Sequence, residues 1–248
     1  MKPRPFFRAL LPLALAIVPA SCTPEPTLVQ GTAVDQGKAL FNDPTIAGTT
    51  LNVYSCATCH TTGTTDPAGK ILAGAPLEGV TMRPSYWGGQ ELELLRSIND
   101  CLYYFMLKDR PWEADDTQAE AMYAYLDSIS QSGKGTEAVA FTVKVKVEDM
   151  PAGDATLGKA VYDQTCHLCH GAAHTGAGKL VQRASILPDQ TVAGHPSPTY
   201  SATDRRLVFI EKTRHGAFLG YGGEMPPFSM DKLSDEQLGD LLAFFGLY

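Results

Sequence analysis

The sequence predicts an all-α protein made of two small domains in tandem, with irregular loops rich in glycine and proline between the helices. Three observations support this fold class. The pattern Cys-x-x-Cys-His occurs twice, at residues 56–60 and 166–170. A Gly-Lys-Ala segment precedes each copy, and a stretch with apolar residues at helical spacing follows each copy further along the chain. Repetition of these features in the same order indicates two copies of one domain.

The repeated motif is the attachment signature of a c-type haem. Two thiols at this spacing add to the two vinyl groups of one porphyrin, and the adjacent imidazole reaches the iron. A single copy would also fit a zinc half-site or a redox pair, but two copies in comparable surroundings favour haem. We therefore expect two covalently bound haem c groups, each containing iron, and a role in electron transfer. The residues assigned by this prediction are Cys56, Cys59, Cys166 and Cys169 as attachment points, with His60 and His170 as iron ligands.

Each domain is expected to begin with a helix before its motif and to end with another. The four expected helical segments are 37–41 and 115–126 in the first copy, and 158–162 and 234–245 in the second. Ser234 followed three residues later by Gln237 is a capping-box start. In the first copy, residues 44–50 look like a loop insertion between the first helix and the motif.

The same features define the domain boundaries. We expect domain 1 over residues 31–133, a linker or strap over 134–152, and domain 2 over 153–248. The glycine-containing segment 132–135 breaks the preceding helix, and strict alternation from Phe141 to Val147 suggests a short extended strap. We interpret this strap as a linker that lies on the surface.

The N-terminus is expected to be a targeting segment rather than part of the fold. Basic residues precede a short apolar stretch over 9–18, so residues 1–21 are predicted to be a secretory signal peptide and not a membrane span. Small residues before Cys22 fit a lipoprotein site, with ordinary cleavage after Ala20 as the alternative. Lipid on Cys22, with residues 22–30 as a tether, would hold the chain at the periplasmic or outer face of a bacterial membrane.

The charge of the chain argues against nucleic acid as a partner. The formal net charge is −7, and removal of residues 1–21 takes away three positive charges and no negative ones, which gives −10. Net charge bears on association rather than on fold. We therefore expect redox partner proteins with basic docking surfaces.

Residues 153–248 resemble class I cytochrome c domains. The resemblance lies in Gly-x-x-x-Tyr before the motif, a glycine after it, Gly-Gly-Glu-Met225-Pro-Pro-Phe, and Leu-Ser-Asp-Glu-Gln before the closing helix. It implies the cytochrome c fold, in which helices and loops surround a covalently bound haem. In this family the methionine before Pro-Pro is the distal iron ligand, which maps onto Met225, and such a ligand raises the reduction potential. Met230 is the nearby alternative.

The distal ligand of the first haem remains open between two residues, Cys101 and Met106. Met106 lies as far before its closing helix as Met225 does, but no Pro-Pro follows it. Met82 stands early in the sequence, and Met122 falls within the expected closing helix, so both are weaker candidates. Cys101 could instead be a small buried hydrophobic residue, since free cysteine is among the most buried residue types.

Around Cys101 the chain resembles the diheme subunit of the sulfur-oxidation cytochromes and the related thiosulfate dehydrogenases. The resemblance covers about residues 80–135 and rests on Arg96-Ser-Ile-Asn-Asp-Cys101 and the tryptophans on either side. It implies that Cys101 ligates the active haem. The arginine of the family stands four residues before the cysteine, where this chain has Ser97. One residue on a helix is a turn of about 100°, so Arg96 need not face the iron.

Two functions follow from these residues. The favoured expectation is an electron carrier that passes electrons between partner proteins at the membrane surface. The alternative is an enzyme whose first haem oxidises a small sulfur anion such as thiosulfate, with Cys101 and Arg96 as the candidate catalytic residues. Anions require paired positive donors, and the candidate cations are Arg83, Arg96, Lys108 and Arg110. A third alternative is a haem subunit docked on a larger membrane oxidoreductase.

Overall fold

A computed structural model describes residues 29–216 and 224–248, and over these ranges the chain is made of helices and loops without a β-strand. The predicted all-α class is confirmed. One isolated bridge pairs Tyr86 with Glu91. The predicted signal peptide over 1–21 and the proposed lipid-bearing Cys22 lie outside the described residues. Within the described ranges, none of the helices has the length and apolar character needed to cross a membrane.

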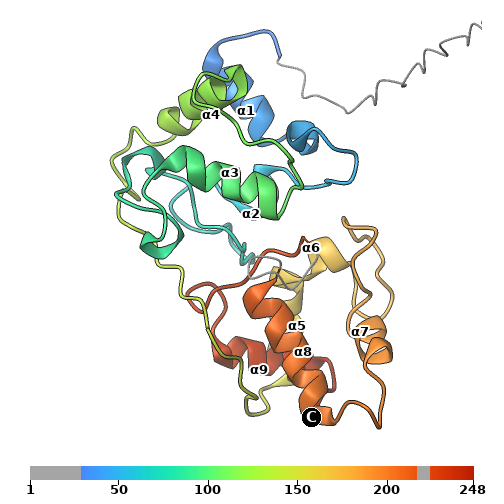
Figure 1. Ribbon diagram of the computed structural model, residues 1–248. Helices are drawn as coiled ribbons and strands as arrows, with labels where there is room; N and C mark the ends of the chain where they lie inside the picture. Colours follow the sequence, from blue (N-terminus) through green and yellow to red (C-terminus); the bar gives the residue numbers. More distant parts are fainter. Residues whose placement is uncertain (1–28, 217–223) are drawn as a thin grey trace, which may run out of the picture.

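The chain forms two lobes, each built around its own apolar core (Figure 1). The first lobe contains α1 (Ala33–Phe41), the 3-10 helix η1 (Pro44–Ala47), α2 (Cys56–Cys59), η2 (Val80–Met82), η3 (Trp87–Gly89), α3 (Leu94–Tyr104) and α4 (Thr117–Ser128). The second contains α5 (Ala155–Thr165), α6 (His167–His170), α7 (Asp189–Gly194), α8 (Ala202–His215) and α9 (Asp235–Phe244). All four helices expected from the sequence are present within these elements.

In each lobe the first helix packs against the last: α1 against α4, and α5 against α9. Both crossings occur at a buried glycine, Gly37 in α1 and Gly158 in α5. A Cβ atom added to Gly37 would overlap the carbonyl oxygen of Ala121, and one added to Gly158 would overlap that of Asp240. The absence of a side chain therefore lets the two helix backbones touch, and it does so at equivalent places in both lobes.

Local capping places the closing helix of the second lobe as the sequence predicted. The Ser234 hydroxyl accepts a hydrogen bond from the Gln237 backbone, and the Gln237 side chain accepts one from the Ser234 backbone, at 3.1 and 2.9 Å. This reciprocal pair satisfies two of the free N–H groups at the helix start. In the first copy, part of the expected loop insertion is the 3-10 helix η1.

The segment over residues 134–152 joins the lobes without regular secondary structure. It differs in one respect from the expected surface linker. The ring of Phe141 packs edge-on against Trp87 with centroids 5.2 Å apart, and the segment 139–141 forms part of a pocket wall in the first lobe. Thr142 then bonds to Asp231 of the second lobe. Phe141 of the alternating stretch therefore packs against the first lobe and Val147 against the core of the second, whereas Val145 is 93% exposed.

The two motif helices, α2 and α6, both lie where the lobes meet (Figure 1). Cys169 of α6 packs against the apolar core of the first lobe. Polar contacts also cross the junction. The backbone N–H of Ile71 donates to the carbonyl of Gln164 at 3.1 Å, and the Lys232 ammonium lies 3.0 Å from the Asp66 carboxylate.

Replacement of Gly158 by alanine tests the close helix crossing. The added methyl group must displace a helix backbone, so we expect the free energy of unfolding to fall by about 1–3 kcal/mol, the usual range for overpacking. Thermal or denaturant unfolding of the haem-loaded protein measures the change. Gly194→Ala is the matched control, because a Cβ at Gly194 meets no atom within 4 Å. Equal stability of the two variants would contradict the close approach of α5 and α9.

Candidate haem sites

The first motif begins at a capped helix start. The Ser55 backbone N–H donates to the Thr58 hydroxyl at 3.0 Å, which completes a capping box before α2. The short helix turns Cys56 and Cys59 toward one pocket, and His60 follows at the point where the backbone becomes extended. Burial raises the pKa of both thiols to about 12, so each is a neutral thiol.

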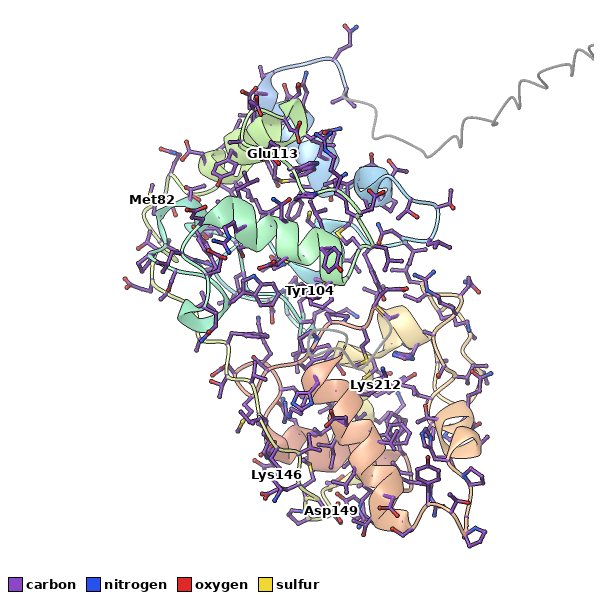
Figure 2. All side chains as sticks on the ribbon, viewed as in Figure 1. Met82, Tyr104, Glu113, Lys146, Asp149 and Lys212 are labelled. Atoms are coloured by element: carbon purple, nitrogen blue, oxygen red, sulfur yellow. The ribbon has the colours of Figure 1, made fainter. Side chains whose placement is uncertain are left out.

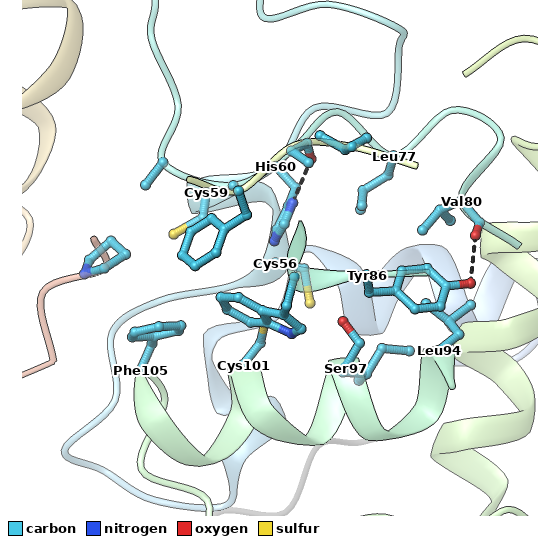
Figure 3. A pocket seen from close by; sticks show the side chains of 18 of the residues that line it. Cys56, Cys59, His60, Leu77, Val80, Tyr86, Leu94, Ser97, Cys101 and Phe105 are labelled. Atoms are coloured by element: carbon cyan, nitrogen blue, oxygen red, sulfur yellow. Dashed lines mark hydrogen bonds between the residues drawn. The ribbon is translucent and has the colours of Figure 1, made fainter. Parts of the chain in front are cut away.

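A large pocket opens beside these residues and encloses about 1410 Å³, including the part open to solvent. Its walls are mostly apolar and come from several elements, with Tyr54, Leu77, Val80, Trp87, Phe105 and Phe141 among them. Figure 3 shows the motif residues on one side and the side chains of α3 rising from the other. An apolar, half-open cavity of this kind suits a flat organic cofactor.

A backbone hydrogen bond fixes the orientation of His60. Its Nδ1 lies 2.7 Å from the Ala75 carbonyl oxygen, which assigns the proton to Nδ1 and leaves Nε2 for a metal (Figure 3). Burial lowers the pKa of His60, although this hydrogen bond acts in the opposite sense. Gly74 lies beside the ring, and a Cβ on this residue would overlap the imidazole. The glycine therefore makes room for the histidine.

Cys101 lies on the face of α3 that lines the pocket. The residues of this face recur at helical spacing and are Leu94, Ser97, Ile98, Cys101, Leu102 and Phe105. Cys101 enters from the side of the pocket opposite the segment that carries His60 (Figure 3). Burial raises the pKa of the Cys101 thiol, so the thiol stays protonated unless its sulfur binds a metal or another strong electrophile.

The methionine candidates separate by position. Met106 is 5% exposed and lines the pocket just beyond the end of α3. Met122, from α4, is also buried and lines it, as expected for a core residue. Met82 is 48% exposed and lies at the outer edge of the first lobe (Figure 2). The structure thus brings both Cys101 and Met106 to the pocket and leaves Met82 outside it.

The candidate cations of the sequence lie in different places. Arg96 points to solvent, with its side chain 70% exposed, and pairs with Glu91 at 3.2 Å. Arg110 is 72% exposed and pairs with Asp116. Neither they nor Lys108 is among the residues that line the pocket. Ser97, one step along α3, takes the pocket-facing position in place of Arg96.

Arg83 is the one of the four candidates that reaches the pocket, and it is 9% exposed. Its guanidinium donates to the carbonyls of Gly135, Pro76 and Glu78 at 2.8, 2.7 and 3.0 Å. These bonds tie the start of the linker to the first lobe. Burial lowers the pKa of Arg83.

Two polar residues of the pocket were not found from the sequence. Lys232 belongs to the second lobe, lines the first pocket and pairs with Asp66. Tyr54 is 5% exposed, lines the pocket and hydrogen-bonds with its hydroxyl to Cys169. Both positions depend on how the lobes meet, so no local pattern indicates them.

The second motif repeats the geometry of the first. The Nδ1 of His170 lies 2.8 Å from the Ser185 carbonyl oxygen, fifteen residues further on, which is also the separation of His60 and Ala75. The Tyr162 hydroxyl donates to the carbonyl of Gly171 at 2.7 Å and so anchors the backbone after the motif. Burial raises the pKa of Cys166 to about 11 and raises that of Cys169.

Met225 lies in the loop between α8 and α9. It is half-buried against the apolar core of the second lobe. The next residues, Pro226 and Pro227, line the pocket of the first lobe. The loop therefore reaches both sites.

The donor sets and surroundings fit haem c. Each site offers two thiols at the attachment spacing and an imidazole whose Nε2 is free to bind a metal. At the first site, the missing side chain of Gly74 also makes room for the histidine ring. When bound, haem c supplies an iron that takes up and releases single electrons, while the protein supplies the ligands and the apolar walls.

The chain is similar to several known proteins. Residues 153–245 match the family model for cytochrome c oxidase, cbb3-type, subunit III. The chain is 27% identical over 242 residues to a thiosulfate dehydrogenase of Allochromatium vinosum, covering 94% of this chain and 83% of that protein. A solved structure of thiosulfate dehydrogenase TsdBA from Marichromatium purpuratum is 18% identical, with a TM-score of 0.42, over 92% of this chain and 49% of that one.

The chain therefore contains a cytochrome c domain and resembles the thiosulfate dehydrogenases, as the sequence predicted. Its cytochrome c domain implies covalently bound haem c, electron transfer and redox partner proteins. The number of haems and the individual iron ligands stay predictions.

Replacement of Gly74 by alanine tests the first site. The added methyl group would displace the His60 ring, so we expect the purified chain to carry one haem fewer than the wild type. Haem absorbance per chain and the intact mass measure this loss. Gly63→Ala, in the same loop, where an added Cβ would meet only the Thr65 carbonyl oxygen at 4.0 Å, should keep the full haem content. Full loading of the Gly74→Ala protein would mean that the histidine is not held against Gly74.

Proposed function

We propose that this chain is an exported diheme c-type cytochrome that passes electrons between partner proteins at the membrane surface. The observation that carries the proposal is the repeated site geometry. Two Cys-x-x-Cys-His motifs each present a histidine whose Nδ1 bonds to a carbonyl fifteen residues away. A second attachment site built in the same way supports a second haem.

The closeness of the two motifs supports passage of electrons from one site to the other. Cys56 of the first motif and Cys169 of the second both pack against the apolar core of the first lobe. Tyr54 lies in contact with Cys169 and lines the first pocket. Tyr54 and Cys169 thus form a direct contact between the first pocket and the second motif.

The proposed location rests on the N-terminal sequence. A signal peptide over 1–21 and lipid on Cys22 would place the chain at the periplasmic or outer face of a bacterial membrane. Residues 22–30 would then connect the lipid to α1. This location brings the chain to membrane-bound redox partners.

A second candidate function is oxidation of a small sulfur anion at the first site. Two observations favour it: Cys101 stands in the same pocket as His60, and the relative from Allochromatium vinosum is a thiosulfate dehydrogenase. The positions of the candidate cations argue against this function, because none of them is available to bind an anion in the pocket. Arg83 is bound to three carbonyls and Lys232 is paired with Asp66, while Arg96 faces solvent. We therefore place the carrier first.

The haem count tests the core of the proposal. We expect two haems per wild-type chain by haem absorbance and intact mass. The double variant Cys166→Ser, Cys169→Ser should keep one, and so should Cys56→Ser, Cys59→Ser. A wild-type count of one would remove the diheme proposal.

A redox titration of Cys101→Met and Met106→Leu identifies the distal ligand of the first haem. A thiolate lowers the reduction potential of iron relative to methionine. If Cys101 is the ligand, Cys101→Met should raise one of the two potentials, and Met106→Leu should change neither. The reverse pattern, with a fall only in Met106→Leu, would assign Met106.

Thiosulfate turnover distinguishes the two functions. The carrier predicts no reduction of the haems by thiosulfate, whereas the enzyme predicts rapid reduction that Cys101→Met abolishes. Rapid reduction in the wild type that is lost in this variant would overturn our ranking. Arg110→Gln, on the exposed surface, is the matched control.

A further inference from the structure

Arg214 is the most deeply buried charged side chain among the residues that the structure describes. It lies in the last turn of α8, and its side chain is 1% exposed. Burial of a guanidinium is costly unless its N–H groups find partners. Its position therefore calls for a specific role.

The partners of Arg214 lie on the loop that carries Met225. One terminal nitrogen donates to the carbonyls of Phe228 and Leu233 at 3.0 and 2.6 Å, and approaches that of Ser229 at 3.4 Å. Phe228 is three residues beyond Met225, and Leu233 closes the loop before α9. A single side chain thus bonds to both halves of the segment that follows Met225.

A charge pair adds to the contacts of Arg214, whose buried Nε has no hydrogen-bond partner among the described residues. Its other terminal nitrogen lies 2.8 Å from an oxygen of Asp235 in the first turn of α9, and Lys144 of the linker lies 2.8 Å from the second oxygen. Hydrogen bonds to Lys144 and Arg214 lower the pKa of Asp235, with burial acting in the opposite sense. The guanidinium is therefore both neutralised and oriented.

The backbone of α8 adds two contacts to the same loop. The carbonyl of Thr213 accepts from the N–H of Phe228 at 2.8 Å. Gly216 lies so close to the Met225 carbonyl that a Cβ there would overlap it. The end of α8 therefore contacts the loop at Met225, at Phe228 and, through Arg214, at Leu233.

We propose that Arg214 is a positioning residue for Met225, holding its loop so that the thioether reaches the iron of the second haem. The inference rests on the proposed role of Met225 as a ligand. A thioether is uncharged and cannot be drawn to iron by charge, so the fold must hold it in place. Lysine, with a single ammonium, cannot reproduce the planar set of donors that spans Phe228, Leu233 and Asp235.

The test uses Arg214→Lys and Arg214→Met in the haem-loaded full chain. We expect loss of most of the methionine-to-iron charge-transfer absorption that the second haem contributes, with a fall in one potential and no change in the other. Arg205→Gln is the control on the same helix, since Arg205 lies near the start of α8 and its guanidinium donates to the Tyr200 carbonyl at 3.2 Å. This control should keep the band and both potentials.

Other outcomes separate the inference from its premise. In the Cys56→Ser, Cys59→Ser background, which keeps only the second haem, Met225→Leu must abolish the band; if it does not, the ligand assignment fails. If Met225→Leu abolishes the band but Arg214→Lys keeps it and only lowers the melting temperature, the positioning role is overturned and Arg214 is merely structural. Should Arg214→Met fail to fold, Asp235→Asn gives a milder test. We expect this variant to weaken the same band. An unchanged band would count against the proposal.

Discussion

Each predicted iron-binding histidine is held by one hydrogen bond, from its Nδ1 to a backbone carbonyl fifteen residues further on, and both sites are arranged around this bond. The bond decides which nitrogen faces the cofactor and how the ring is turned. The distal residue must then stand on the opposite side of the pocket. In the first lobe that side is formed by α3 with Cys101, whereas in the second lobe the loop of Met225 is the candidate.

The meeting of the two lobes builds the first site as much as its own lobe does. The pocket around His60 takes walls from Pro226 and Pro227, a cation from Lys232, and an aromatic ring from Phe141 of the linker. The second motif is similarly involved, because Cys169 packs on the core of the first lobe. The chain contains two copies of one domain, but residues of both copies together form the first site.

Local features could be predicted from the sequence because neighbouring residues determine them. The attachment motifs span five residues. Ser234 and Gln237, which mark the start of the closing helix, are three positions apart. Whether Arg96 faces the pocket or solvent depends on which face of α3 packs against the rest of the lobe. The sequence does not determine this face, so the exposure of Arg96 became clear only from the structure. The roles of Gly74 and Lys232 depend on contacts between distant segments, which no local pattern encodes.

The loop that begins at Met225 has a consequence for how this chain can change over time. Met225 faces the core of the second lobe, while the two prolines after it form part of the first pocket. A substitution in this loop therefore bears on both predicted haem sites at once. Duplicated domains usually diverge independently, each free to tune its own chemistry. Here the shared loop couples their evolution, so neither copy can be exchanged for an unrelated domain without rebuilding the other.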